Sequence, residues 1–171
     1  MDDQSIIKIN LNNQDLFITE GYINGSFTSG NSKKKFSVLN PATGECIANL
    51  PDMGIKETKE AIDKAELAQK EWASKTGKER ASILRKWYDL IIENKDDLAK
   101  ILTTEMGKPL AEASGEIVYG ASFVEWFSEE AKRVYGDTIP GHQDDKRIVI
   151  IKQPVGVVGA ITPWNFPNAM I

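Results

Sequence analysis

Charged side chains are absent from the last 17 residues of this sequence, and that absence limits what this segment can form. All 21 Lys and Arg and all 25 Asp and Glu lie in residues 1–154. The uncharged segment is slightly too short for a membrane span, and hydrocarbon would tolerate its prolines and asparagines poorly. Val155 to Ile161 is apolar on both faces, which is typical of an interior strand of a parallel sheet. We therefore predict a buried strand here, and a folding unit that continues beyond Ile171, because chain termini usually lie at the surface.

Composition excludes several classes of protein. A content of 41% hydrophobic and 27% charged residues is that of a globular chain and not of a disordered one. The net charge of −4 gives no electrostatic footprint for nucleic acid or for an acidic membrane surface. The single cysteine, Cys46, and the single histidine, His142, cannot provide an internal disulfide or a metal site. The acidic start, Met1-Asp2-Asp3, lacks the apolar region of a secretory signal, so we expect a cytoplasmic protein that binds neither nucleic acid nor membranes.

The first fifty residues predict small β structure. Asn24-Gly25 within Phe17 to Phe27 is a strong hairpin signal. Two further short strands, Phe36 to Leu39 and Cys46 to Leu50, flank a turn that is dense in Pro, Gly and Asn. These segments are too short to form an extensive sheet by themselves.

Helical periodicity replaces the β pattern from about Lys56, and it predicts four helices before residue 136. A capping box at Thr76 to Glu79 opens the second helix. The apolar side chains that this helix is expected to turn inward are Ile83, Leu84, Trp87, Leu90 and Ile91. Asn94 separates the second helix from the third, and Gly107 suits the left-handed cap that ends the third at Met106.

The fourth helix is predicted to run from Pro109 as far as Tyr135, with Gly136 ending it. Its predicted inward stripe of apolar side chains consists of Ala113, Ile117, Ala121, Val124, Phe127, Ala131 and Val134. Gly115 and Gly120 lie inside it, and each costs roughly 1 kcal/mol relative to alanine. Close approach of another element at these two positions would compensate for that cost. A loop then leads to a strand at residues 147–152, which carries four consecutive aliphatic side chains and charged ends.

The segment Ile161 to Pro167 is the strongest candidate for a functional site. It follows directly on the predicted buried strand, and ligands in open α/β sheets bind at the carboxyl ends of strands. Pro163 and Pro167 fix their own φ and bias the residues before them toward extended backbone. A rigid segment of this kind would hold the amide of Asn165 in one place, where its N–H₂ group could stabilise an oxyanion. The alternative is that Asn165 satisfies a turn and Trp164 fills the core, and the residues alone favour this alternative.

The other polar groups are weaker candidates for a functional site than the segment Ile161 to Pro167. Glu112 with Glu116, and Glu129 with Glu130, are expected to form a solvated helix face. Cys46 is expected to be a small buried apolar residue. The motif Gly156-x-x-Gly159 is not a dinucleotide fingerprint, and the residues alone provide no complete catalytic set and no metal site.

Six segments of the sequence form recognisable motifs: Tyr22-Ile23-Asn24-Gly25, Asn40-Pro41-Ala42-Thr43-Gly44, Thr104-Glu105-Met106-Gly107-Lys108-Pro109-Leu110, Gly115-Glu116-Ile117 through Tyr135-Gly136, Lys152-Gln153-Pro154-Val155-Gly156-Val157 and Ile161 to Pro167. Together they resemble the amino-terminal half of the aldehyde dehydrogenase family, and the resemblance covers the chain from about Phe17 to Ile171. The segment Tyr119 to Phe127 is most similar to the succinate-semialdehyde dehydrogenases of that family.

The resemblance implies an α/β fold in which a helical layer accompanies the start of a Rossmann-like parallel sheet, with a protruding β arm for oligomerisation. Residues 1–135 would be the amino-terminal part of the cofactor-binding domain, 136–154 the oligomerisation arm, and 155–171 the first sheet strand with a truncated active-site loop. The arm would make a homodimer or a homotetramer by pairing with another subunit.

The resemblance also implies a mechanism. A cysteine thiolate attacks the aldehyde, hydride passes to NAD or NADP, and water hydrolyses the thioester with help from a glutamate. By motif match, Asn165 would be the oxyanion donor, and Ile161, Thr162, Pro163, Trp164 and Asn165 would line the cofactor. The nucleophile and the base would lie beyond Ile171, so these 171 residues alone are expected to be inactive. A short interaction module without catalytic activity is the alternative function.

Overall fold

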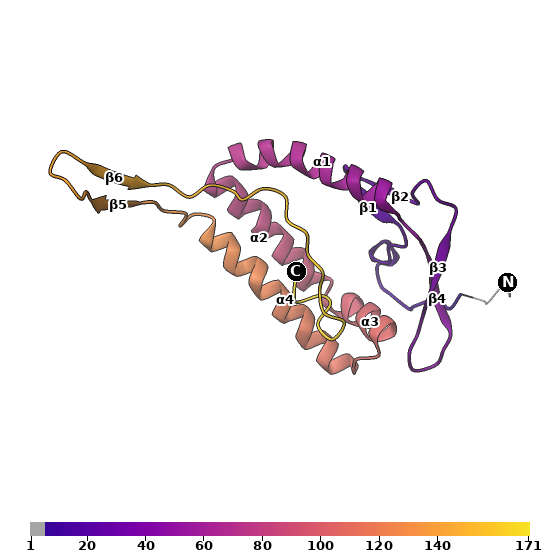
Figure 1. Cartoon of the computed structure of the whole chain (residues 1–171). Helices are drawn as coiled ribbons and strands as arrows, with labels where there is room; N and C mark the ends of the chain where they lie inside the picture. The colour runs from indigo at the N-terminus through magenta and orange to yellow at the C-terminus, as the bar shows by residue number, and fades with distance from the viewer. Residues whose placement is uncertain (1–5) are drawn as a thin grey trace.

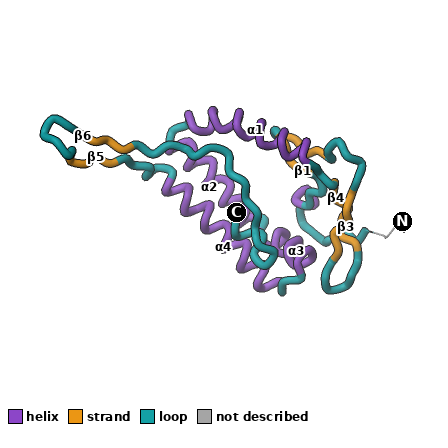
Figure 2. Tube along the Cα trace, viewed as in Figure 1, coloured by secondary structure: helices purple, strands orange, loops and turns teal. Residues whose placement is uncertain are grey.

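The structure is a computed structural model that describes residues 6–171, and it is elongated (Figure 1). Within these residues, two small β-hairpins lie at one end, four α-helices lie in the middle, and a third hairpin projects from the other end. Figure 2 shows that a long loop segment follows this last hairpin and runs back along the helices. The chain is therefore a mixture of helix and sheet, with its helices at the centre.

The two amino-terminal hairpins form where the sequence predicts them. Strands β1 (Gly21–Ile23) and β2 (Ser26–Thr28) are antiparallel, and they follow a short 3₁₀ helix at Gln14–Leu16. Asn24 and Gly25 connect the two strands with φ values of 53° and 80°, which is the left-handed backbone that a two-residue hairpin turn requires. Strands β3 (Lys35–Leu39) and β4 (Cys46–Pro51) form the second antiparallel pair.

Four helices follow, and their boundaries agree with the predicted start and stop signals except at one end. They are α1 (Ile55–Ser74), α2 (Gly77–Glu93), α3 (Lys95–Met106) and α4 (Leu110–Glu130). The Thr76 hydroxyl accepts from the Glu79 N–H, and the Glu79 carboxylate accepts from the Thr76 N–H, so the predicted capping box is confirmed. Gly107 ends α3 with φ 82°. Helix α4 stops at Glu130 and does not reach Tyr135.

The core lies where α4 packs against α2 and α3. Two of its four central residues are alanines, which allow close approach of the helices, and the other two are large aliphatic residues that fill the space between them; the four are Ala99, Leu102, Ala113 and Ile117. Ser128 is buried and Phe127 is exposed, although the predicted stripe contains Phe127. The reason is geometric. Ser128 lies about two helical turns after buried Ala121, and it therefore shares the inward face of the helix with Ala121.

Glu57 ties the start of α1 to the loop before β3. Its Oε1 accepts from the backbone N–H of Asn31 at 2.8 Å and from the Asn31 side chain at 3.0 Å, while its Oε2 accepts from the Gly54 N–H at 3.0 Å. These bonds favour the charged carboxylate, and the Asn31 backbone bond contributes most. They lower the pKa of Glu57 from 4.5 to about 2.

We predict that the Glu57 carboxylate makes the free energy of unfolding depend on pH in the acidic range. The unfolded chain binds a proton at Glu57 near pH 4.5, whereas the folded chain does so only near pH 2. The stabilisation is therefore fully present above about pH 4.5 and is lost as the pH falls toward about 2. Urea denaturation across this range should show a shallower pH dependence for Glu57→Gln than for the unaltered chain. Glu60→Gln, exposed on the same helix, is the matched control, and an identical slope for Glu57→Gln would contradict the prediction.

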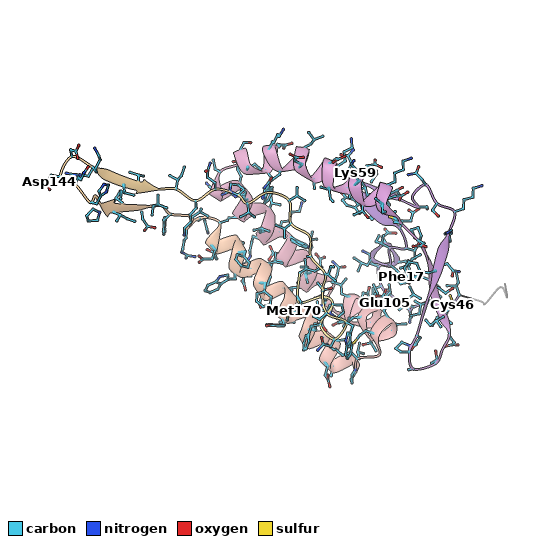
Figure 3. The ribbon with its side chains drawn as sticks, viewed as in Figure 1. Phe17, Cys46, Lys59, Glu105, Asp144 and Met170 are labelled. Carbon is cyan, nitrogen blue, oxygen red and sulfur yellow. The ribbon has the colours of Figure 1, made fainter. Side chains whose placement is uncertain are left out.

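The third hairpin projects away from the helices (Figure 1). Strands β5 (Asp137–Pro140) and β6 (Arg147–Ile150) pair in an antiparallel register, and all their residues are exposed. Asp144 lies at the tip of this hairpin (Figure 3). The predicted strand at residues 147–152 is thus confirmed in its first four residues. Residues 137–140, predicted as loop, form the partner strand.

The predicted buried strand at Val155 to Ile161 is wrong. The segment has no strand conformation, and Val155 and Ile161 are 93% and 102% exposed. A strand needs a neighbour to pair its backbone groups, and within residues 6–171 no other segment provides one, since the described sheets are three two-stranded pairs. Within 155–171 only Ala169 is buried. The described chain therefore contains no parallel sheet.

The surface of the chain is unusually large for its mass. It measures 12693 Å² for 19.0 kDa, whereas a compact folded monomer of this mass exposes roughly 8,400 Å². Large apolar side chains on α2, including Ile83, Trp87 and Leu90, are exposed although the sequence predicts them to face inward. Among the described helices, none combines the length and the apolar character needed to cross a membrane.

Candidate functional site

The segment that contains Asn165 folds back onto α4. After the long loop runs along the helices, its last residues form a series of turns at 164–170 and end beside the middle of the molecule (Figures 1 and 2). The Phe166 N–H donates to the Pro163 carbonyl at 3.3 Å. Ala169 is 2% exposed. The turn segment at 163–169 is thus packed against the helices, although the residues that lead to it are not.

Glu116 on α4 holds this turn segment through its backbone. Its Oε1 accepts from the N–H groups of Asn168 at 2.9 Å and Ala169 at 3.3 Å. Glu116 is only 2% exposed, so its prediction as part of a solvated face is wrong. Glu112, one turn earlier, is exposed as predicted. The signal for Glu116 was its position, because it lies on the helix face that also carries Ala113 and Gly120.

Lys108 holds the turn segment together with Glu116, although its sequence context indicates no functional role. It lies between the left-handed cap of α3 at Gly107 and Pro109 at the start of α4. Its ammonium donates to Glu116 Oε2 and to the Asn165 carbonyl, the latter at 2.7 Å. The same ammonium lies 4.0 Å from the centre of the Phe166 ring, a favourable cation–π distance. Lys108 is 8% exposed, so these contacts replace nearly all of its hydration.

The glycines of α4 differ in what lies beside them. A Cβ at Gly120 would lie 2.6 Å from the Asn168 side-chain nitrogen and 3.2 Å from the Ala169 Cα, whereas a Cβ at Gly115 would have no neighbour within 4 Å. The expected close approach of another element is therefore confirmed at Gly120 and wrong at Gly115. Gly120 allows the turn segment to lie directly on the helix.

We predict opposite effects for alanine at these two positions. Gly115→Ala should raise the free energy of unfolding by about 1 kcal/mol, because alanine favours the helix and meets no obstacle. Gly120→Ala should lower it by about 1–3 kcal/mol, because the new methyl group displaces the turn segment. Urea denaturation followed by circular dichroism measures both, with Gly115→Ala as the matched control. Equal shifts for the two variants would show that the turn segment does not lie against Gly120.

Lys108 binds the main-chain carbonyl of Asn165, while the side chain of Asn165 is exposed. Within the described residues, its side-chain amide makes no hydrogen bond. Two N–H donors therefore extend from a backbone that Lys108 fixes at one end and Glu116 fixes three residues later. The predicted turn role, in which the side chain satisfies the loop, does not describe this arrangement. An exposed amide on an anchored backbone can donate to a negatively charged oxygen.

The neighbouring residues of the predicted cofactor strip are accessible. Ile161, Pro163 and Trp164 are exposed, and Thr162 is half-buried. No hydrogen bond within the described residues uses the backbone of Val155 to Thr162. The strip therefore offers apolar surface, an indole ring and backbone donors and acceptors next to Asn165.

Cys46 does not belong to this site. It is 2% exposed on β4, where its Sγ lies 3.6 Å from the Ala48 carbonyl, in agreement with its predicted structural role. Figure 3 shows Cys46 on the hairpin of β3 and β4, well separated from Met170 at the end of the turn segment. Across residues 6–171, no three His, Cys, Asp or Glu side chains are arranged to hold a metal ion.

Comparison with known proteins gives one consistent result. Residues 27–171 match the model of the aldehyde dehydrogenase family. The glutarate-semialdehyde dehydrogenase of Pseudomonas putida is 58% identical over 94% of this chain and 34% of its own length. The NADP(+) succinate-semialdehyde dehydrogenase of Escherichia coli is 56% identical over 94% of this chain and 33% of its own. A crystal structure of an E. coli NADP-dependent enzyme superposes with a TM-score of 0.92 at 56% identity, covering 94% of this chain and 34% of that one. The chain spans about a third of the length of the curated relatives it matches.

Proposed function

The chain belongs to the aldehyde dehydrogenase family, and we propose that it serves as the amino-terminal third of an NAD(P)-dependent enzyme that oxidises succinic semialdehyde, or a related aldehyde, to the carboxylic acid. The observation that carries this proposal is the exposed amide of Asn165 on a backbone anchored by Lys108 and Glu116. Relatives that are 56–58% identical are named for succinate and glutarate semialdehyde, and both compounds are short aldehydes with a distal carboxylate.

In the proposed mechanism, Asn165 stabilises the oxygen of the aldehyde. When a thiolate adds to the carbonyl carbon, the carbonyl oxygen becomes negatively charged. The Asn165 N–H₂ group donates to this oxygen. Because the backbone around Asn165 is already fixed, little reorganisation is needed as the charge develops, and this is the condition under which such donors accelerate a reaction.

The strip at 161–165 would hold the cofactor. Its exposed apolar side chains and unbonded backbone groups fit a nicotinamide and its ribose, which present one flat face and several hydroxyls. When bound, NAD⁺ or NADP⁺ accepts the hydride that leaves the substrate. We assign Ile161 to Trp164 to contact with the cofactor, and Asn165 to contact with both cofactor and substrate.

The thiolate does not come from Cys46, which is buried on a distant hairpin. We propose that the nucleophile and the hydrolytic glutamate come from polypeptide outside these 171 residues. The large exposed apolar surface of the helices supports this proposal, because surface of this kind is usually covered. The chain by itself is then inactive. A cytoplasmic location agrees with a single cysteine that has no disulfide partner in the chain.

We assign a separate role to each of three segments of the chain. Residues 1–135 contribute to the cofactor-binding domain, residues 136–154 form an arm, and residues 155–171 carry the active-site loop. The arm is a projecting two-stranded hairpin with exposed aliphatic side chains, so it can pair with a sheet of another subunit. We propose a homodimer or a homotetramer assembled through it.

A hybrid enzyme tests the proposed function. The matched third of the E. coli succinate-semialdehyde dehydrogenase is replaced by this chain, and formation of NADPH or NADH is followed with succinic and glutaric semialdehyde. We expect turnover in the ordinary enzymatic range of about 1–10³ s⁻¹. The E. coli enzyme that lacks its own matched third is the control and should be inactive. A soluble hybrid that binds the cofactor but oxidises neither aldehyde would contradict the proposal and would favour an interaction module.

A further inference from the structure

A buried ion pair joins the start of α4 to the turn segment, and its arrangement suggests more than a structural contact. Lys108 and Glu116 have side chains that are only 7% and 1% exposed. Their charged groups bond to each other and also to the backbone at three points, namely the Asn165 carbonyl and the N–H groups of Asn168 and Ala169. The pair therefore fixes one short stretch of backbone from both sides.

We propose that Lys108 and Glu116 are positioning residues, which hold the turn at 165–169 so that the Asn165 amide stands ready for the oxyanion. This inference rests on the proposed function, because it assigns Asn165 the role of oxyanion donor. Neither residue touches the substrate in this scheme. Both act through Asn165.

The geometry explains how the side-chain amide would be aimed. Lys108 binds the carbonyl of Asn165 itself, at 2.7 Å, and so limits rotation of the peptide unit that follows the catalytic side chain. Glu116 binds the N–H groups three and four residues later. Pro163 and Pro167 restrict φ on either side of Asn165. The backbone of Asn165 therefore has few remaining ways to move.

The chemical nature of the pair also favours a positioning role. Burying two charges removes their hydration, and apolar residues of the same volume often stabilise a fold as well or better. Lys108 and Glu116 could satisfy each other without the turn segment, since Lys108 lies just before α4 and Glu116 lies on α4. The pair instead uses its remaining bonding capacity on backbone groups around Asn165. Hydrogen bonds to charged groups are directional and strong, so they fix position in a way that apolar contacts do not.

A double-mutant cycle in the hybrid enzyme tests this inference. The variants are Glu116→Gln, Asn165→Ala and the two combined, and the readouts are kcat and the melting temperature. Glu116→Gln keeps one acceptor oxygen but faces the Lys108 ammonium with an amide. We expect kcat to fall by about tenfold or more, because small misplacements of a catalytic group have effects of this size. In the Asn165→Ala background the same change should alter kcat by less than about threefold, since residues that act as a unit are not additive.

Two controls separate positioning from folding. Glu112→Gln changes an exposed carboxyl on the same helix, and it should leave kcat unchanged. The double variant Lys108→Met with Glu116→Gln removes both buried charges together, so it should remain folded even if a single substitution does not. It should still lose activity, because it no longer binds the Asn165 carbonyl.

Each outcome of the cycle has one interpretation. An equal fold-loss from Glu116→Gln in both backgrounds would overturn the inference, because the pair would then act on the enzyme independently of Asn165. Full kcat in the folded Lys108→Met, Glu116→Gln variant would also overturn it. A normal kcat for Asn165→Ala would contradict the proposed function itself, whereas a low kcat for Asn165→Ala with a normal kcat for Glu116→Gln would contradict only the positioning role.

Discussion

Replacing Asn165 with alanine in the hybrid enzyme should lower kcat/KM by about 10²–10³-fold, which corresponds to about 2.7–4 kcal/mol of lost transition-state stabilisation. The substitution removes both side-chain N–H donors and leaves the main chain unchanged. Because the anchor bonds use the Asn165 carbonyl and the N–H groups of Asn168 and Ala169, the turn segment should stay in place. The melting temperature should therefore change little.

The variant Asn165→Asp tests specifically whether the Asn165 side chain donates to a developing negative charge. Aspartate has nearly the same shape, but it places a negative charge where the amide donated. Its kcat/KM should fall at least as far as that of Asn165→Ala. Steady-state kinetics with succinic semialdehyde measure both variants. Activity retained by the aspartate variant would mean that Asn165 does not face a developing negative charge.

Replacing Lys108 with methionine should lower the free energy of unfolding of this chain by about 3–5 kcal/mol, the usual effect of removing one partner from a buried ion pair. Methionine fills a similar volume but leaves the Glu116 carboxylate buried without its cation. It also releases the Asn165 carbonyl and loses the contact with the Phe166 ring. Urea denaturation followed by circular dichroism gives the value.

Lys86→Met is the matched control for this prediction, because Lys86 is exposed on the neighbouring helix α2. Its effect should lie within about 0.5 kcal/mol. Adding Glu116→Gln to Lys108→Met should recover part of the lost stability, since no unpaired charge then remains in the interior. If Lys108→Met and Lys86→Met unfold at the same urea concentration, the buried pair does not exist in solution.

Local signals explain why much of the fold could be predicted from the sequence. The hairpin at Asn24-Gly25, the capping box at Thr76 to Glu79 and the cap at Gly107 each depend on a few adjacent residues. Their backbone preferences are strong enough to appear in the sequence alone. The helix boundaries that depend on them were therefore placed to within a few residues.

The errors arise where a residue depends on distant partners. Glu116 looks like a surface carboxylate in its own helix, but its partners in the turn segment lie more than fifty residues later. Val155 to Ile161 has the composition of a buried strand, yet within residues 6–171 no strand lies beside it. Composition records the environment for which a segment is suited, and it does not provide the neighbours that create that environment.

The candidate site was predicted in part. The two prolines and the family resemblance together indicate Asn165, whereas the cofactor role proposed for the strip at 161–164 rests on the resemblance alone. Lys108 was not identified, because one lysine between a glycine and a proline carries no sign of burial. Only the fold shows that its ammonium reaches the Asn165 carbonyl.

Hydrogen exchange at the amides of Asn168 and Ala169 tests most directly whether Glu116 anchors the Asn165 turn. Both amides donate to Glu116, whereas those of Val155 to Ile161 donate to no described residue. In this chain we predict slow exchange at the first two amides and fast exchange at the others. Glu116→Gln should accelerate exchange at Asn168 and Ala169, and Glu112→Gln should not. Exchange at Asn168 and Ala169 as fast as at Val155 to Ile161 would contradict the anchored turn and the role proposed for Asn165.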